Sequence, residues 1–180
     1  MKVPFRVMTV CTGNICRSPM AEVLLREAFE AAGLGDAVVV DSTGISSEEE
    51  GNPVDRRARQ VLAEHGYPAG DGHRARRVST DELAGCDLVL PMTAQHARVL
   101  RRLVANAGLD GEPGTPGPEI HMFRTFDPEA PVLRPDDREE LLDVEDPWYG
   151  GMGDFQVCLR ELEAAVPGIV KAVQERVAAG

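Results

Sequence analysis

Short apolar runs and helix-spaced apolar positions alternate along the chain. The runs are too short for helices and are rich in Val, Leu and Phe, so we expect buried strands there. The predicted strands span residues 5–10, 38–40, 88–90 and 119–123. Between them, apolar residues recur at helical spacing, which predicts helices that bury one face. The predicted helices span residues 18–32, 55–65 and 94–107, and Gly33 and Gly66 end the first two.

The last part of the chain also has helical spacing. Its apolar positions are Phe155, Leu159, Leu162, Val166, Ile169, Val170, Val173 and Val177. Pro167 interrupts this pattern. Because proline lacks a backbone donor and clashes with the preceding turn, we expect a kink or two helices that meet near Val166. Ser79 and Glu82 have the spacing of a capping box, which predicts a short helix before the third strand.

Strands that alternate with helices are typical of a parallel sheet with helices packed on it, so the predicted fold class is α/β. Residues 108–118 are rich in Gly and Pro, and residues 127–143 are acidic and contain proline, so both segments are predicted surface loops. No internal repeat is visible, and the C-terminal helix needs the same core as the strands. We therefore expect one domain over residues 1–180.

Composition and charge narrow the classes of protein. The 180 residues carry a formal net charge of -11, from 30 acidic and 19 basic residues, which argues against a nucleic-acid partner. No run approaches the roughly 20 apolar residues of a membrane span, and the first residues lack the pattern of a signal peptide. Four cysteines are too few for a disulfide scaffold in a chain of this length. We expect a cytoplasmic protein without a membrane partner.

The segment after the first predicted strand carries the most chemistry. It comprises Cys11, Thr12, Gly13, Asn14, Ile15, Cys16, Arg17, Ser18 and Pro19. Free backbone N–H groups at the start of a helix, together with the helix dipole, favour a bound anion. Arg17 can grip two oxygens of a phosphate, and the positive field favours the reactive thiolate of Cys11. Ser18 is placed to donate its hydroxyl hydrogen to that sulfur.

Other kinds of site fit this loop less well. The chain contains neither of the glycine patterns of nucleotide-binding loops. Cys11 and Cys16 have the wrong spacing for a zinc site and no matching Cys/His pair follows, so we expect no metal and no cofactor. The simplest alternative for Cys11 is a buried core thiol at a strand end. The neighbouring Gly13, Arg17 and Ser18 favour a phosphate-binding loop instead.

Residues 10–19 resemble the loop V-C-x-G-N-x-C-R-S-P of the low-molecular-weight protein tyrosine phosphatases. Further agreement lies at residues 20–22, 41–42, 55–58, 65–66, 73–76, 86–87 and 146–150. The resemblance therefore extends over nearly the whole chain. It implies a three-layer α/β/α fold with a central four-stranded parallel sheet and a phosphate-binding loop after the first strand.

The resemblance also implies a reaction. Cys11 attacks the phosphorus of phosphotyrosine to form a phosphocysteine, while Asp146 protonates the departing phenol oxygen and later deprotonates a water molecule. Arg17 and the backbone N–H groups of Thr12 to Ser18 bind and stabilise the phosphoryl oxygens. A second Asp-Pro pair, at Asp127, has no aromatic pair behind it and is predicted to start a turn.

The implied substrates are phosphotyrosine-containing proteins. Whether a cognate tyrosine kinase is a partner is left open by the sequence. We expect a monomer. Trp148 and Tyr149 are predicted to wall a slot for the flat ring, with core packing as the alternative. Asn14, Ser42 and His73 resemble the polar residues that hold the loop in shape, with Asn14 in an unusual backbone conformation. Ordinary surface polarity is the alternative for Ser42 and His73.

Some positions depart from the family pattern or have a second interpretation. Cys16 is placed to pair with Cys11 under oxidation and so to block the nucleophile reversibly; the alternative is a small buried residue at a helix start. Glu48 stands where relatives often carry an aromatic wall residue, and Thr93 replaces a common aspartate. The successive glutamates 48–50 either favour basic residues beside the phosphotyrosine or form a solvated loop.

Three rival functions involve the same residues. Arginine phosphatases share the loop but resemble C-x-G-N-T-C-R-S, and Ile15 in place of that threonine favours an aryl substrate. Arsenate reductases of this fold need two further cysteines near the third strand; residues 90–92 supply none, and Cys86, like Cys158, is a predicted core residue. A phosphoprotein-binding module without turnover has no use for a proton donor at Asp146.

Overall fold

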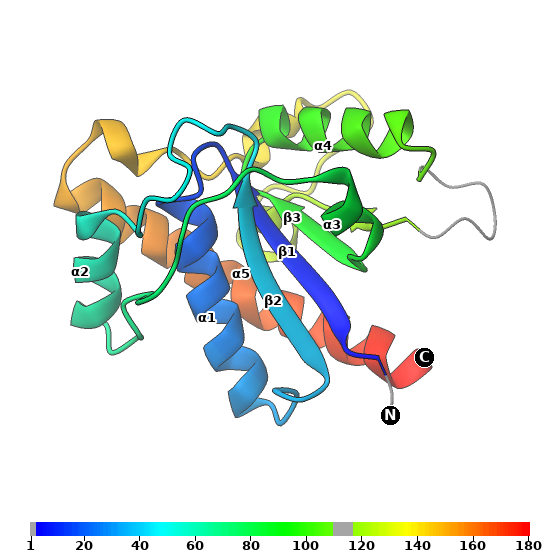
Figure 1. The fold of residues 1–180 in the computed structure, drawn as a ribbon, viewed down its shortest axis with the longest axis horizontal. Coiled ribbons are helices and arrows are strands. Elements are labelled where there is room, and N and C mark those ends of the chain that lie inside the picture. Colours follow the sequence, from blue (N-terminus) through cyan, green and yellow to red (C-terminus); the bar gives the residue numbers. More distant parts are fainter. Residues whose placement is uncertain (1–2, 110–116) are drawn as a thin grey trace.

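The computed structural model describes residues 3–109 and 117–180 (Figure 1), and these residues contain a four-stranded sheet. The strands are β1 (Phe5–Cys11), β2 (Val38–Gly44), β3 (Leu88–Pro91) and β4 (Glu119–Ile120). Each neighbouring pair is parallel, and the strand order is β2-β1-β3-β4. The predicted α/β class with four parallel strands is confirmed.

Helices connect and cover these strands. The α-helices are α1 (Arg17–Ala31), α2 (Arg56–Glu64), α3 (Thr80–Ala84), α4 (Ala94–Asn106) and α5 (Met152–Ala179). Three short 3-10 helices lie between β4 and α5: η1 (Phe123–Phe126), η2 (Glu139–Leu142) and η3 (Pro147–Tyr149). The first three predicted helices are confirmed to within a residue or two at each end. The capping box is also confirmed, because Ser79 and Glu82 each bond the other's backbone N–H ahead of α3.

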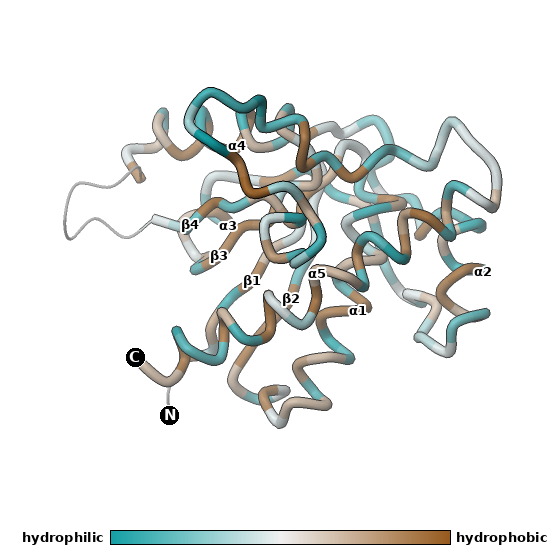
Figure 2. The backbone as a smooth tube through the Cα atoms, turned by 180° about the vertical axis from the view of Figure 1, so that it is seen from behind, coloured by the Kyte–Doolittle hydropathy of each residue, from teal (hydrophilic) through white to brown (hydrophobic). Residues whose placement is uncertain are grey.

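Alternate residues of β1 and β3 point into two separate cores, one on each face of the sheet. Val7 and Leu88 face the larger core, which α1, α2 and α5 complete. Met8 and Val89, one position further along the same strands, face the smaller core under α3 and α4. Figure 2 shows hydrophobic segments recurring along β1 and β3. The result is the expected three-layer arrangement, because a parallel sheet buried on both faces needs helices on both.

The structure corrects two predictions for the second half of the chain. The strand predicted over residues 119–123 stops at Ile120, because the chain turns into η1, where Phe123 is fully buried and Thr125 N–H bonds the carbonyl of Met122. The two-helix alternative around Val166 is also wrong, since α5 runs unbroken through Pro167. That proline lies on the exposed side of α5, where the unpaired carbonyl one turn earlier can meet water.

Close packing of α5 on η1 depends on the residue that follows this proline. A Cβ atom on Gly168 would lie 2.4 Å from the carbonyl oxygen of Phe126, so the two backbones approach more closely than any side chain permits. Across the molecule, the start of β1 and the end of α5 lie side by side (Figure 1). In the described part of the chain, no helix has the length and apolar character to cross a bilayer.

The predicted surface loops are only partly described. Most of residues 108–118 lies outside the described residues. Residues 127–143 are largely exposed but include η2, whose Leu142 is buried. Asp127 starts a turn as predicted, because its carboxylate accepts a hydrogen bond from the N–H of Glu129. Cys86 and Cys158 are buried, as predicted for core residues.

Candidate active site

The loop between β1 and α1 lies at the carboxyl end of the sheet. The strand order reverses at this point, because β2 lies on one side of β1 and β3 on the other. In open α/β sheets, ligands bind at this kind of position. The end of β2 holds the loop from behind: Ile45 N–H bonds the carbonyl of Cys11, and Ser46 N–H bonds that of Thr12. A Cβ atom on Gly44 would lie 2.5 Å from the Thr12 carbonyl oxygen, so the loop can approach β2 this closely only because residue 44 is glycine.

A cavity of about 180 Å³ opens above this loop. Its lining residues are Cys11, Thr12, Gly13, Ile15, Cys16, Arg17, Glu48, Glu49, Asp146, Trp148 and Tyr149. The structure therefore brings together the predicted nucleophile, the arginine, the acid and both aromatic residues, although 135 positions separate Cys11 from Asp146. The other predicted site residues, Asn14, Ser18, Ser42 and His73, lie outside the cavity lining and contact the loop from below.

The loop offers hydrogen-bond donors that the protein itself leaves unused. The backbone N–H groups of residues 13–16 donate no hydrogen bond to any other described residue. Arg17 is 4% exposed; its Nη1 donates to the carbonyl of Val144 at 2.9 Å, but its buried Nε has no partner among the described residues. Unpaired buried donors are costly unless a ligand satisfies them. A cluster of free N–H groups and a guanidinium is suited to a tetrahedral oxyanion.

The sulfur of Cys11 lies at the base of this cluster, 3.0 Å from the hydroxyl oxygen of Ser18. That hydroxyl accepts a hydrogen bond from Asn14 Nδ2 and lies 3.2 Å from the carbonyl of Thr43. Its single hydrogen can turn toward the carbonyl when Cys11 is a thiol and toward the sulfur when Cys11 is a thiolate. Ser18 is thus placed to stabilise the charged form of the nucleophile.

Asn14 organises the loop from beneath. It has φ +60°, the left-handed conformation that asparagine tolerates better than most residues, so the predicted unusual conformation is confirmed. Its side-chain amide donates to Ser18 and Ser42, and its side-chain oxygen accepts from Arg76 N–H. Its own carbonyl oxygen lies 2.7 Å from Nε2 of His73. Ser42 and His73 therefore contact the loop directly, which argues against ordinary surface polarity.

Replacing Asn14 with alanine is expected to lower the free energy of unfolding by about 3 kcal/mol. The change removes two buried hydrogen bonds and one part-buried one, and leaves a residue that adopts φ +60° at a cost of about 1–2 kcal/mol. Urea denaturation measures the loss. Asn106→Ala, at the exposed end of α4, is the matched control and should change stability little. Equal denaturation midpoints for the two variants would contradict the organising role of Asn14.

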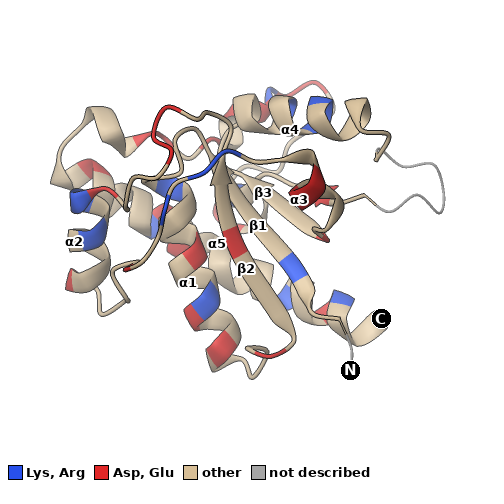
Figure 3. Ribbon diagram, viewed as in Figure 1, with Lys and Arg blue, Asp and Glu red and all other residues tan. Residues whose placement is uncertain are grey.

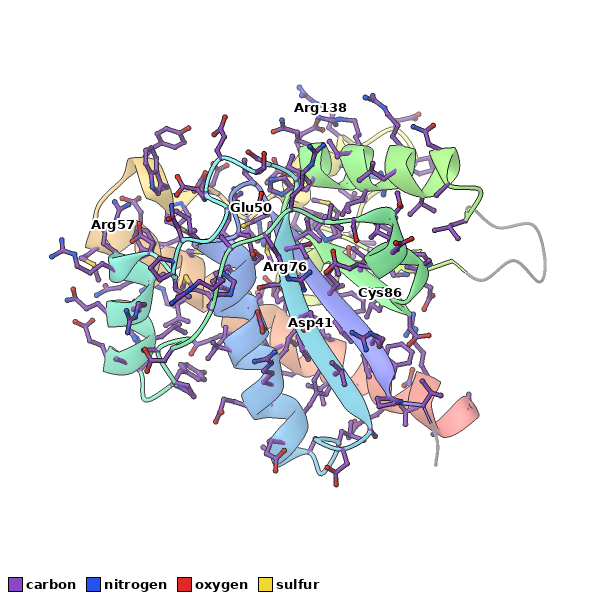
Figure 4. All side chains as sticks on the ribbon, in the orientation of Figure 1. Asp41, Glu50, Arg57, Arg76, Cys86 and Arg138 are labelled. Atoms are coloured by element: carbon purple, nitrogen blue, oxygen red, sulfur yellow. The ribbon has the colours of Figure 1, made fainter. Side chains whose placement is uncertain are left out.

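Asp146 lies at the start of η3, where its carboxylate accepts a hydrogen bond from Trp148 N–H and lies 3.3 Å from Nη2 of Arg17. Arg57 fixes the same loop, because its Nη1 donates to the carbonyls of Trp148 and Gly150. The guanidinium also bonds Asp55. Figure 4 shows Arg57, in the first turn of α2, beside the segment that leads into α5. The acid is therefore held over the loop by contacts from α1 and α2.

The walls of the cavity combine aromatic and acidic side chains. Trp148 and Tyr149 are 46% and 83% exposed and meet edge to face with ring centroids 5.0 Å apart, so core packing is the wrong interpretation for them. On the opposite side the acidic loop after β2, marked red in Figure 3, contributes Glu48 and Glu49. Asn52 Nδ2 donates to Glu49, and a Cβ atom on Gly13 would lie 3.1 Å from Glu49 Cγ. Glu49 thus rests on the phosphate loop itself.

Cys16 lines the cavity but is 4% exposed. Burial, together with the negative charge of Asp55, raises the pKa of the Cys16 thiol far above its ordinary value. Cys16 therefore keeps its proton near neutral pH and does not compete with Cys11 as a nucleophile. Both cysteines are free in this structure, so the predicted reversible disulfide stays a prediction. Among the described residues, no group of His, Cys, Asp or Glu side chains could hold a metal ion.

Several residues of the site were not found by sequence reasoning. Gly44 and His96 contact the loop from β2 and α4, Glu22 accepts a hydrogen bond from Ser42, and Arg57 anchors the loop of Asp146. Glu22 and Arg57 belong to stretches that resemble the phosphatase family. The resemblance indicated that these stretches matter but assigned no function to either residue. Gly44 and His96 carried no signal, because nothing local distinguishes them from other residues of a strand end or a helix.

Comparison with known proteins shows which family has this fold and this loop. Residues 6–179 match the family described as low molecular weight phosphotyrosine protein phosphatase. The chain belongs to this family. It is 42% identical over 178 residues to low molecular weight protein-tyrosine phosphatase A of Mycobacterium tuberculosis, covering 99% of this chain and 97% of that protein. A second relative, the low molecular weight protein-tyrosine-phosphatase of Streptomyces coelicolor, is 42% identical over 173 residues, with 96% of each chain covered.

A solved structure with the same fold extends the comparison. The crystal structure of an arginine phosphatase from Drosophila superposes with a TM-score of 0.77 at 26% identity, covering 93% of this chain and 96% of that one. The low molecular weight phosphatase fold is therefore shared by proteins named for two different phosphorylated residues. The shared fold by itself therefore does not choose between phosphotyrosine and phosphoarginine.

Proposed function

We propose that this low molecular weight phosphatase hydrolyses phosphotyrosine in proteins, with Cys11 as nucleophile, Arg17 as phosphate ligand and Asp146 as general acid and base. One observation carries the proposal: free loop N–H groups and an unpartnered guanidinium nitrogen surround a cysteine sulfur at the base of a cavity. Such donors match the oxygens of a phosphoryl group and stabilise the charge that these oxygens carry in the transition state.

The reaction proceeds in two displacements. The thiolate of Cys11 attacks phosphorus in line, the bond from phosphorus to the phenol oxygen breaks, and Asp146 gives that oxygen its proton. A water molecule then attacks the phosphocysteine, Asp146 accepts a proton from the water, and the phosphorus–sulfur bond breaks. The products are a phenol and inorganic phosphate, and Ser18 stabilises the returning thiolate through its hydroxyl hydrogen.

The remaining loop residues serve binding. Thr12, Gly13, Ile15 and Cys16 form the floor of the cavity together with the nucleophile. Trp148 and Tyr149 supply exposed ring surface at its mouth, which suits the flat ring of a tyrosine. Asn14, Ser42 and His73 support the loop from below. A module that only binds phosphoproteins needs the donors but not a carboxylate beside Arg17, so we favour a hydrolase.

We propose that residues 1–180 act as one domain and as a monomer in signalling, and that a cognate tyrosine kinase phosphorylates the substrates. The cytoplasm is the proposed compartment, because four cysteines are too few for a disulfide scaffold in a chain of 180 residues.

Hydrolysis of phosphotyrosyl and phosphoarginyl peptides, measured side by side, tests the substrate class. The wild-type protein is expected to favour phosphotyrosine, and Ile15→Thr is expected to shift the ratio of kcat/KM values toward phosphoarginine by about tenfold, because the smaller side chain reshapes the floor of the cavity. Cys11→Ser is the blank in both assays. A wild-type preference for phosphoarginine would overturn the proposed substrate, and phosphopeptide binding without hydrolysis would favour a recognition module.

A further inference from the structure

A buried histidine contacts the phosphate loop from outside the proposed catalytic set. His96, in the first turn of α4, is 1% exposed, and its Nε2 lies 2.8 Å from the hydroxyl oxygen of Thr12, 84 positions earlier in the chain. Nη2 of Arg17, the nitrogen that faces Asp146, lies 3.5 Å from the same hydroxyl oxygen. Thr12 itself is exposed and lines the cavity. Its hydroxyl thus stands between the histidine and the site of the phosphoryl group.

The position of one hydrogen on the imidazole decides what this hydroxyl can do. The other ring nitrogen, Nδ1, is buried and has no partner among the described residues. An unpaired buried N–H is rarer in proteins than an unpaired acceptor, so the hydrogen belongs on Nε2. Burial and the nearby charge of Arg17 lower the pKa of His96 to about 3, which keeps the ring neutral. Nε2–H therefore donates to Thr12.

With its oxygen occupied by this donor, the Thr12 hydroxyl keeps its own hydrogen free. Within the described residues, the two neighbours of that oxygen, His96 Nε2 and Arg17 Nη2, are both donors. The hydroxyl hydrogen can then point only to solvent or to a group in the cavity. A phosphoryl oxygen held by Arg17 is the acceptor that the site provides for it.

We propose that Thr12 donates a side-chain hydrogen bond to a non-bridging oxygen of the bound phosphoryl group, and that His96 is a positioning residue that orients this donor. The proposal rests on the phosphate site of the proposed function. It assigns to the side chain of Thr12 a role distinct from that of the loop backbone, and it places a residue of α4 in contact with the machinery of the β1–α1 loop.

Two measurements test the proposal, and neither needs turnover. The first is the dissociation constant of inorganic phosphate, measured by titration calorimetry on wild type, Thr12→Val, His96→Phe and the double variant. Thr12→Val and His96→Phe are each expected to weaken phosphate binding by about tenfold, and the double variant also by about tenfold, because both remove one shared interaction. The second is nitrogen-15 NMR of the wild-type imidazole, expected to place the hydrogen on Nε2.

Conservative variants separate positioning from folding. Thr12→Ser keeps the hydroxyl, and His96→Gln keeps a donor near the place of Nε2, so both should bind phosphate within about twofold of wild type. Thr93→Val is the matched control on the same helix: it removes the side-chain cap that bonds His96 N–H but leaves the imidazole in place. It should lower stability without weakening phosphate binding.

Clear outcomes would overturn the proposal. A loss of about a hundredfold in the double variant would mean that the two residues act independently. An equal loss of phosphate affinity in Thr93→Val would mean that any disturbance of α4 weakens phosphate binding, whether or not it touches the imidazole. A hydrogen on Nδ1 would make Thr12 the donor to His96, and the Thr12 hydroxyl would then have no hydrogen left to donate to the phosphoryl group. If wild type binds phosphate with this pattern but hydrolyses no phosphotyrosine, the proposed function fails and the inference stands.

Discussion

Replacing Cys11 with serine is expected to lower kcat for an aryl phosphate by about 10⁵-fold, because a serine hydroxyl at this place is a far weaker nucleophile and no other described thiol lines the cavity in a reactive form. Stability should stay close to wild type, since serine fills nearly the same volume beside Ser18. Pre-steady-state hydrolysis of p-nitrophenyl phosphate measures the effect. The variant should still bind inorganic phosphate through Arg17 and the loop N–H groups.

Cys86→Ser is the matched control. Cys86 is 8% exposed and belongs to the core between the sheet and α4, away from the cavity. Burying a hydroxyl there costs some stability but should leave kcat unchanged. If Cys11→Ser kept appreciable turnover, or if Cys86→Ser lost as much, the nucleophile would have been assigned to the wrong sulfur.

Replacing Asp146 with asparagine is expected to lower kcat for phosphotyrosine by about 10²–10³-fold. Asparagine keeps the acceptor for Trp148 N–H but cannot supply a proton to the phenol oxygen. Because tyrosine is a poor leaving group with a pKa of about 10, it depends strongly on that proton. The loss should therefore shrink for aryl phosphates whose phenols are more acidic, and a series of such substrates measures this dependence.

Asp127→Asn is the matched control, because Asp127 also precedes a proline and also caps a turn but lies outside the cavity lining. Its kcat should match that of wild type with every leaving group. A uniform loss in Asp146→Asn, independent of the leaving group, would mean that Asp146 shapes the site without transferring a proton.

Local sequence patterns were sufficient for most of the fold. Apolar runs and helical spacing located β1, β3, α1, α2 and α4 because each of these elements buries one or both faces in a regular way. The same reasoning was wrong at residues 121–123, where Met122 and Phe123 are buried at the start of η1 and do not continue β4. Of the two outcomes expected at Pro167, a kink or two helices, the two-helix one is wrong, because the cost of one proline is smaller than the gain from burying a long helix face.

The loop of Cys11 and Arg17 was visible in the sequence because its residues are consecutive, and a strand–loop–helix unit fixes their geometry locally. The pairing of Arg17 with Asp146 was expected only through the resemblance to the phosphatase family. No local rule brings together residues so far apart in the chain, and the contact depends on α2 and Arg57 holding the later loop in place.

The sequence by itself determined the α/β class, the phosphate loop and its reactive groups, since these follow from periodicity and from one continuous motif. Only the tertiary structure decided which residues surround the loop. These are Gly44, whose missing side chain lets the loop approach β2, Glu49, which contacts Gly13, and the neutral His96, which bonds Thr12. These contacts arise between β1, β2 and α4 when the sheet and its helices pack. Their energies depend on burial and distance in three dimensions, which neighbouring positions in a sequence do not encode.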